Sequence, residues 1–335
     1  MRHAWWLSAC LLAVAGSVVL GSGGPLRAVS RVEAAQSAGD RPEPVEFRSA
    51  ADLVPLNVVV TDRHQQVVSG LTRTDFVVLE DGVPQTVSHF TAGGAPLDLA
   101  VLLDASGSMA DRMPAVRAAA RGFVNAVRGI DRVMVVSVKR ATTVLQPLAA
   151  DVPGALAAIE SARSGGTTGL YNGLYFTLKE LNRTGLASGG QVRRKAIVVL
   201  SDAVDTTSLL SFEDVLDVAR GAGVAIYPIN LRSEVAAAAD RGRGRVLSDA
   251  EHSMKQLAQE TGALAFFPDR IEALDGVYES IAGELGGQYS LAYASSNPRR
   301  DGAFRRISVQ VADRPDVRAR TRSGYEAPRP PRPGA

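Results

Sequence analysis

The chain has 335 residues, of which 46% are hydrophobic and 21% charged, so its composition is that of a folded globular protein and excludes an intrinsically disordered one. Lys and Arg number 37 against 35 Asp and Glu, and the resulting net charge of +2 argues against nucleic acid as the partner. The length allows two domains, since one core usually serves about 100 to 200 residues.

The N-terminus has the pattern of a secretory signal over residues 1–35. Arg2 and His3 precede an apolar run, and small and polar residues then lead to Ala35, the expected last residue before cleavage, with Ala28-Val-Ser30 as the other candidate. An uncleaved membrane anchor is the alternative, but the run is short for a membrane span. We therefore expect an exported protein, periplasmic, on the cell surface or secreted, without membrane insertion after cleavage. Cys10, the only cysteine, lies in the signal, so no disulfide is expected.

Short alternating strands follow a linker rich in Pro, Ser and charge at residues 36–51. An N-terminal β region is expected over residues 52–95, where apolar and polar residues alternate and Asp81-Gly82 forms a hairpin turn before another strand at 87–90. A similar C-terminal β region is expected over residues 287–326. Because each region has one face to cover, we expect the two to pack together as one small β-sandwich-like domain.

Residues 96–286 alternate apolar strands with amphipathic helices, which predicts a doubly wound, mostly parallel α/β sheet flanked by helices. The expected strands are 97–103, 133–138, a weaker one at 143–148, 196–200, 224–229 and 263–267. The expected helices are one opening near Pro114 and those at 153–161, 170–182, 212–222, 253–261 and 270–285. The tail at 327–335 is mostly Pro, Arg and Gly and is expected to be disordered.

The most informative feature is the end of the first of these strands, where the apolar run stops at Asp104. Ser106 and Ser108 follow at alternate positions. One carboxylate with two hydroxyls suits a hard divalent cation that is held by oxygen atoms but not neutralised by its protein ligands. An isolated pattern of this kind also fits a helix-capping turn, because Ser and Asp are preferred caps.

Asp104, Ser106 and Ser108 resemble the metal-ion-dependent adhesion site of von Willebrand factor type A domains, and the resemblance covers about residues 96–286. That family also supplies a threonine from a Gly-rich loop that opens a helix, and Thr168 matches it, with Thr167 as the alternative. It supplies an aspartate that ends the next strand, here Asp202. The family's usual glycine after that aspartate is Ala203 here, which leaves the turn geometry open. Asp205 is expected to support the loop from outside the ligand set.

The resemblance implies a Mg²⁺ site, with Mn²⁺ or Ca²⁺ as alternative ions. In the family arrangement Ser106 and Ser108 bind the ion directly, Thr168 binds directly or through water, and Asp104 and Asp202 act largely through water. An open position on the ion would accept a glutamate or aspartate of a protein partner. The implied function is that of an exported, metal-ion-dependent protein-binding module of the adhesion type, and not an enzyme.

The flanking regions carry a second resemblance, to a group of exported bacterial proteins named only for their von Willebrand-related domain. It rests on Thr61-Asp62, Asp75-Phe76, Glu80-Asp-Gly82 and Arg322-Ser-Gly-Tyr325. It implies architecture and export but no specific partner.

Two other functions compete with metal-dependent binding. A scaffold that uses the fold without metal is one, although a lost site has no physical reason to keep five oxygen donors. A metal-assisted hydrolase is the other, but the chain has no Gly-x-Ser-x-Gly elbow, and a nucleophilic serine needs a neighbouring base. The histidines of the mature chain, His64, His89 and His252, each stand alone in a β edge or polar loop.

Overall fold

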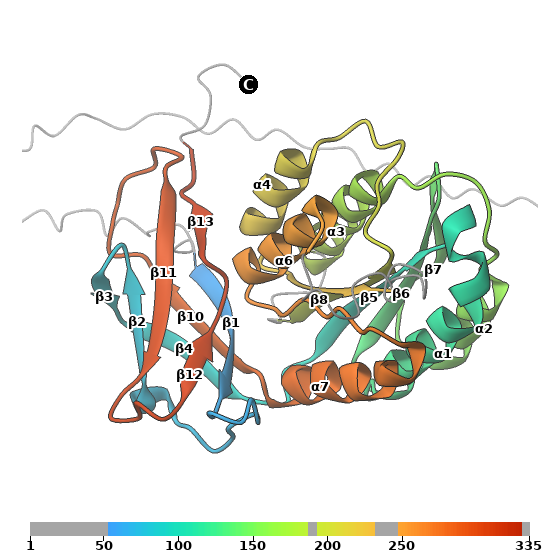
Figure 1. Ribbon diagram of the computed structural model, residues 1–335. Coiled ribbons are helices and arrows are strands. Elements are labelled where there is room, and N and C mark those ends of the chain that lie inside the picture. Colours follow the sequence, from blue (N-terminus) through green and yellow to red (C-terminus); the bar gives the residue numbers. More distant parts are fainter. Residues whose placement is uncertain (1–52, 187–192, 232–246, 330–335) are drawn as a thin grey trace, which may run out of the picture. The chain divides into compact units, whose positions relative to one another are not determined.

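The computed structural model describes residues 53–186, 193–231 and 247–329 (Figure 1). The expected signal at 1–35 and linker at 36–51 therefore lie wholly outside the described residues. The described part contains one five-stranded sheet with helices and two four-stranded sheets. Within it, no helix combines the length and apolar character that crossing a bilayer requires.

The five-stranded sheet confirms the expected doubly wound fold. Its strands lie in the order β7-β6-β5-β8-β9, and β7 at one edge is antiparallel to β6 while the other pairs are parallel. The central strand is buried along its whole length, as expected for a parallel strand covered on both faces. The strands are β5 (Leu97–Asp104), β6 (Arg132–Val138), β7 (Thr142–Ala149), β8 (Arg194–Ser201) and β9 (Ala225–Asn230).

Helices cover both faces of this sheet (Figure 1). On one face α1 (Met113–Asn125), α2 (Val152–Ser161) and α7 (Leu274–Gly287) share a hydrophobic core with Leu99, Val101 and Leu103 of β5. On the other face α3 (Leu170–Leu186), α4 (Phe212–Ala222) and α6 (Asp249–Glu260) share a second core with the alternate residues Ala100 and Leu102. The period of two along β5 thus divides the hydrophobic residues between two core layers.

Local signals explain where several helices begin. Pro114 lies in the first turn of α1, where the missing N–H of proline costs no helical hydrogen bond. The expected helix at 253–261 instead begins at Asp249, because the Ser248 hydroxyl accepts from the Glu251 N–H at 3.2 Å and the Glu251 carboxylate accepts from the Ser248 N–H at 2.8 Å. The last helix begins at Leu274 rather than 270, after the 3-10 turn η3 (Ile271–Ala273).

The expected strand at 263–267 was wrong, because the structure forms only an isolated parallel bridge between Ile229 and Phe266. The Phe266 N–H donates to the Pro228 carbonyl, and the Phe266 carbonyl accepts from the Asn230 N–H, both at 2.8 Å. Extending this ladder in either direction would require an N–H from Pro228 or from Pro268. Proline has none, so the pairing stops after one bridge.

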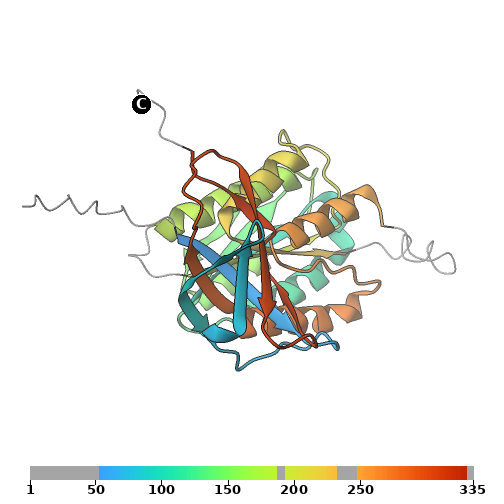
Figure 2. The same ribbon diagram turned by 90° about the vertical axis from the view of Figure 1, so that its left-hand side faces the viewer.

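The flanking regions form the expected β-sandwich-like domain from both ends of the chain, and Figure 2 views it face-on. One sheet has the order β12-β1-β10-β4, and the other has the order β13-β11-β2-β3. Each sheet mixes strands from before and after the α/β domain. The strands are β1 (Leu53–Thr61), β2 (Phe76–Glu80), β3 (Val83–Gln85), β4 (Val87–Ala92), β10 (Tyr289–Ala294), β11 (Phe304–Val311), β12 (Arg318–Arg320) and β13 (Gly324–Glu326).

The Asp81-Gly82 turn forms with φ values of 49° and 82°, but the strand that it returns is the short β3, which ends at Gln85. The following β4 pairs with β10 in the opposite sheet. Ala327 is buried and its N–H donates to the Ala303 carbonyl at 2.9 Å. The tail predicted to be disordered over 327–335 is therefore still part of the fold at its first residue.

The α/β domain joins the sandwich at the amino edge of the five-stranded sheet. β4 leads into β5 there, and α7 leads into β10, whose Tyr289 pairs with Ala92 of β4. The Ser323 N–H donates to the Glu260 carbonyl at 3.0 Å, and Arg320 forms an ion pair of 2.5 Å with Glu284 on α7. The carboxyl edge of the sheet, where β5 ends at Asp104, is left for the candidate site.

Candidate metal centre

The two predicted aspartates lie at one edge of the sheet because they follow neighbouring parallel strands. β5 and β8 pair in register up to Leu103 and Leu200, so Asp104 ends one strand beside the end of the other. Asp202 follows β8 directly. In a doubly wound sheet the carboxyl ends of the strands carry the ligand site.

Four of the five predicted ligands form a continuous chain of contacts. The Ser106 N–H donates to Asp104 Oδ1 at 2.9 Å, and the hydroxyls of Ser106 and Ser108 lie 3.1 Å apart. The Ser108 hydroxyl donates to Asp202 Oδ2 at 2.7 Å. Neighbouring oxygens around an octahedral Mg²⁺ lie about 3 Å apart, since each is about 2.1 Å from the ion. The oxygens of Ser106, Ser108 and Asp202 already have that spacing.

Asp104 is fully buried, and both of its carboxylate oxygens accept hydrogen bonds. The Ser201 hydroxyl donates to Oδ2 at 2.6 Å. Burial raises the pKa of Asp104, hydrogen bonds from Ser201 and Ser106 oppose that rise, and the nearby Asp202 carboxylate adds to it. A cation placed among these oxygens would offset both the burial and the repulsion between the two carboxylates.

The Gly-rich loop that carries Thr168 is held against the Asp104 loop by two backbone hydrogen bonds. The Gly107 N–H donates to the Gly166 carbonyl, and the Gly165 N–H donates to the Ala105 carbonyl, both at 2.8 Å. Gly165 and Gly166 have φ values of 150° and 77°, a backbone conformation that residues with a side chain rarely adopt. The glycines therefore allow the backbone turn that brings the two hydrogen-bonding groups of this loop to the Asp104 loop.

Thr168 is a better candidate ligand than Thr167. Thr168 is buried, and its backbone is fixed by Thr206, whose hydroxyl accepts from the Thr168 N–H at 3.0 Å. Among the described residues no hydrogen bond engages the Thr168 hydroxyl, whereas the exposed Thr167 hydroxyl accepts from Thr207 at 3.5 Å. The ligand roles of Thr168 and of the other four residues stay predictions.

Asp205 lies outside this chain of contacts and supports the start of α3. Its carboxylate accepts from the Tyr171 N–H at 2.9 Å and from the Ser208 hydroxyl at 2.6 Å. Ala203, in the place of the family's glycine, adopts a φ of 66°. The turn thus keeps the left-handed backbone that glycine favours, although an alanine there is strained.

Three contributors to the site were not predicted from the sequence. Ser201 holds the Asp104 carboxylate, and Thr206 holds the backbone of Thr168. Arg112, at the end of the 3-10 helix η2 (Gly107–Arg112), places Nη1 3.9 Å from Asp202 Oδ2. Ser201 could have been found from its position at the strand end, but no sequence signal indicates that Arg112 folds back onto Asp202.

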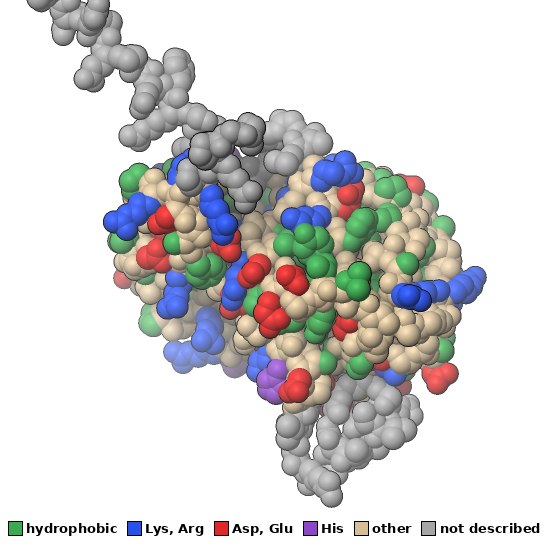
Figure 3. All heavy atoms as spheres, turned by 90° about the horizontal axis from the view of Figure 1, so that it is seen from above, with side chains coloured by type: hydrophobic (Ala, Val, Ile, Leu, Met, Phe, Trp, Pro, Cys, Tyr) green, Lys and Arg blue, Asp and Glu red, His purple; other side chains and the backbone are tan. Residues whose placement is uncertain are grey.

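The described residues contain no cluster of three or more His, Cys, Asp or Glu side chains that would hold a metal. The predicted site has two carboxylates and three hydroxyls, so it differs in kind from such a cluster. His64, His89 and His252 are exposed. On the face in Figure 3, described acidic, basic and hydrophobic side chains are interspersed.

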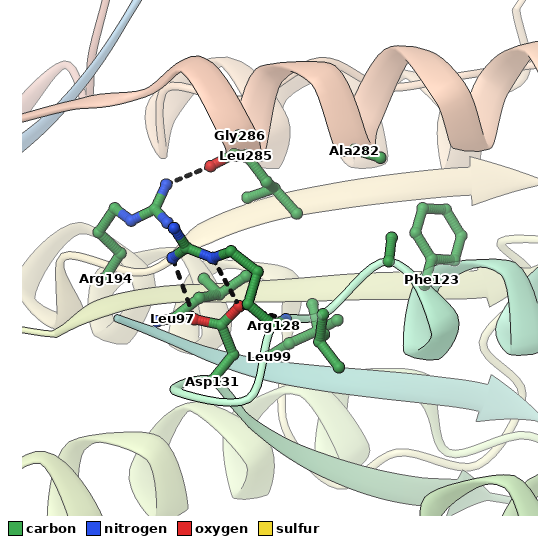
Figure 4. Close-up of a pocket in the computed structure, with 11 residues that line it drawn as sticks. Leu97, Leu99, Phe123, Arg128, Asp131, Arg194, Ala282, Leu285 and Gly286 are labelled. Carbon is green, nitrogen blue, oxygen red and sulfur yellow. Dashed lines mark hydrogen bonds and ion pairs between the residues drawn. The ribbon is translucent and has the colours of Figure 1, made fainter. Parts of the chain in front are cut away.

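A cavity of about 220 Å³ lies between β5, α1 and α7, near the amino end of β5 and away from Asp104 (Figure 4). Arg194 closes one side by donating to the Leu285 carbonyl at the end of α7 and to the Ala95 carbonyl at 2.7 Å. Burial, with a smaller contribution from Arg128, lowers the pKa of Arg194 to about 10. Because one of its hydrogen bonds goes to the Leu285 carbonyl in the last turn of α7, Arg194 caps that helix.

Residues 99–204 match the family model of the von Willebrand factor type A domain. No curated protein matches the chain. Among similar solved structures, BatB from Bacteroides thetaiotaomicron has 16% identity and a TM-score of 0.40, covering 56% of this chain and 98% of its own. A von Willebrand factor type A protein from Catenulispora acidiphila has 12% identity and a TM-score of 0.45, covering 84% and 75%.

Proximal thread matrix protein 1 from the mussel byssus, with a zinc-occupied MIDAS motif, has 14% identity and a TM-score of 0.45, covering 62% of this chain and 49% of its own. At these identities and TM-scores the solved structures add nothing to the assignment. It rests on the strand order of the α/β domain and on the family match from β5 to the loop after β8. This protein therefore contains a von Willebrand factor type A domain.

Proposed function

We propose that this protein is a metal-ion-dependent protein-binding module that recognises an acidic residue of its partner. The observation that carries the proposal is the convergence of Asp104, Ser106, Ser108 and Asp202 at the carboxyl edge of the sheet. Domains of this family generally mediate interactions between proteins, and many of them bind a divalent metal at such a site. The proposed ion is Mg²⁺, with Mn²⁺ or Ca²⁺ as alternatives.

The donor set supports a hard ion. All five candidate ligands offer oxygen, and the mature chain has no cysteine to favour a softer metal. When bound, the ion would supply a Lewis-acidic position open to a carboxylate of the partner. Asp104 would orient the ion from its buried position, since both its oxygens are already held by Ser106 and Ser201.

The loop that follows Asp202 exposes apolar side chains, of which Val204 lies beside the candidate site. Val204 is 50% exposed, and Leu209 is 95% exposed. The Val204 N–H donates to Asp202 Oδ1 at 3.3 Å, which keeps this part of the loop close to the carboxylate. Exposed apolar side chains next to a charged centre favour a protein partner over a small inorganic anion.

The test is calorimetric titration of the mature protein with Mg²⁺ and with Mn²⁺. We expect about one ion per chain, and we expect binding to vanish in the double variant Asp104→Ala, Ser106→Ala. The matched control is Ser88→Ala, which changes a serine of the sandwich whose hydroxyl donates to the Ala292 carbonyl at 3.1 Å. If the wild-type protein takes up neither ion, the metal-independent scaffold becomes the better function.

Export completes the proposal, since an adhesion-type module acts outside the cytoplasm. It rests on the signal pattern at 1–35, which lies outside the described residues. Fractionation of producing cells, followed by N-terminal sequencing of the mature protein, tests it. We also propose that the protein is not an enzyme, because among the described residues no histidine forms a hydrogen bond with Ser106 or Ser108 that would let it act as a base.

A further inference from the structure

Arg112 lies at the candidate metal centre as a fixed cation. Its Nη2 donates to the Ser108 carbonyl at 3.0 Å, and its Nη1 donates to the Leu231 carbonyl just after β9. Nη1 also lies 3.9 Å from Asp202 Oδ2. The side chains of Arg112 and Asp202 are only 14% and 12% exposed. Two carbonyls from separate segments therefore hold the guanidinium beside a predicted metal ligand.

This position differs from that of an ordinary surface arginine. A surface ion pair gains little, because both side chains lose freedom and water screens the charges. Arg112 is instead tied to the backbone of Ser108, itself a candidate ligand, so it cannot swing away without breaking hydrogen bonds to two carbonyls. Its charge acts on the centre whether or not an ion is present.

The charge at the centre changes sign when a divalent ion enters. Asp104, Asp202 and Arg112 together carry one net negative charge in the absence of an ion. Adding a divalent cation gives one net positive charge. Without Arg112 the two carboxylates would balance the ion, and the loaded centre would be neutral. The loaded centre of this chain thus attracts an anion more strongly than its metal ligands alone would.

We propose that Arg112 couples ion binding to ligand binding: it weakens the affinity for a divalent ion alone, and it strengthens the affinity of the loaded centre for a carboxylate. This inference rests on the proposed function and adds to it a residue that sets ligand specificity. Coupling of this kind is reciprocal, so a carboxylate raises the affinity for the ion by the same factor as the ion raises the affinity for the carboxylate.

The experiment compares Mn²⁺ affinity in the wild-type protein and in Arg112→Gln, Arg112→Lys and Arg121→Gln, at low ionic strength, with and without acetate as the carboxylate probe. Arg121→Gln is the matched control, since it removes an equal charge from α1 at an exposed pair with Glu160. Circular dichroism melts check that every variant is folded.

We expect Arg112→Gln to bind Mn²⁺ about tenfold more tightly or better, as Coulomb's law gives for a unit charge near a divalent ion at a partly solvated site. Arg112→Lys keeps the charge and should bind Mn²⁺ like the wild type, and so should Arg121→Gln. Acetate should tighten Mn²⁺ binding in the wild type and less so in Arg112→Gln. Added salt should shrink the difference between wild type and Arg112→Gln.

Three results would overturn the inference. Equal Mn²⁺ affinity in the wild type and Arg112→Gln would show that the guanidinium charge does not reach the ion, while the proposed function would stand. Equal shifts in Arg112→Gln and Arg112→Lys would show that the carbonyl contacts matter and the charge does not. Absence of Mn²⁺ binding in every variant would overturn the proposed function together with this inference, whereas binding in Arg112→Gln alone would support both.

Discussion

Replacing Glu80 by glutamine tests how the two ends of the chain are held together in the sandwich. Glu80 ends β2, is 2% exposed, and accepts from the hydroxyls of Tyr293 at 2.7 Å and Tyr325 at 3.0 Å. Its other oxygen accepts from Ser295 at 2.5 Å and from Arg305 Nη1 at 3.2 Å. One carboxylate from the N-terminal region thus binds four donors from the C-terminal region.

The expected cost follows from the burial of the ion pair. The side chains of Arg305 and Glu80 are 3% and 2% exposed, so removing the carboxylate leaves a buried cation without its counter-charge. Breaking such a pair costs about 3–5 kcal/mol. Glutamine keeps the volume and one acceptor oxygen, and Arg305 also donates to the Asn297 carbonyl at 2.9 Å, so the lower value of about 3 kcal/mol is expected.

The effect should depend on pH. Burial pushes the pKa of Glu80 upward, but hydrogen bonds from Ser295, Tyr293, Tyr325 and Arg305 outweigh it and hold the pKa below the ordinary value of 4.5. A lowered pKa in the folded state means that the carboxylate contributes its stability in full above the unfolded value. That stability is lost as the pH falls through the folded pKa. The difference between wild type and Glu80→Gln should therefore be largest near neutral pH and shrink below about pH 4.

Urea unfolding followed by circular dichroism at pH 7 and at low pH measures this. With a slope of about 3 kcal/mol per molar urea, the midpoint at pH 7 should fall by about 1 M. Glu326→Gln is the control, since Glu326 lies exposed on β13 of the same sandwich and should leave the midpoint nearly unchanged. An unchanged midpoint in Glu80→Gln, or a fall of equal size at both pH values, would refute the charge argument.

Three further changes give sharp expectations. Gly262→Ala should lower the stability of the fold by about 2 kcal/mol or more in thermal melts, because Gly262 has a φ of +80° and the new Cβ would lie 2.6 Å from the Thr321 carbonyl carbon. The control is Gly221→Ala in α4, which should leave the stability unchanged or raise it slightly, because no atom lies within 4 Å of the new Cβ. Mg²⁺ at about 100 times its Kd should stabilise the wild type by about 2.7 kcal/mol in the same melts, and Asp104→Asn should abolish that gain. Asp98→Asn removes the fully buried carboxylate that pairs with Arg132 and Arg193. It should lower the urea midpoint as Glu80→Gln does, but by destabilising the α/β domain and not the sandwich.

Much of the candidate site could be predicted from the sequence because strand ends are visible as the ends of apolar runs. In a parallel sheet the carboxyl ends of neighbouring strands meet at one edge, so Asp104 and Asp202 could be placed together although they lie far apart in the chain. The alternation of apolar and polar residues likewise predicted the sandwich strands near both ends of the chain. These inferences need only local patterns and the general rules of sheet geometry.

The strand expected at 263–267 shows where local pattern is insufficient. Its residues are apolar enough for a buried strand, but a strand also needs donors and acceptors in register on its neighbour. Pro228 and Pro268 lack the N–H groups that would extend the pairing, but this matters only because Phe266 lies beside Ile229, which no local pattern shows. The register belongs to the pair of segments and to neither segment alone.

The sequence by itself therefore determined the fold class, the position of each candidate ligand at a strand end or loop, and the presence of a second β domain made from both termini. Only the tertiary structure decided which side chains face one another: Glu80 with Tyr325, Ser201 with Asp104, and Arg112 with Asp202. Backbone periodicity is local and can be read along the chain. The partner of a polar side chain depends on loop paths and rotamers, which are set only when the whole domain has packed.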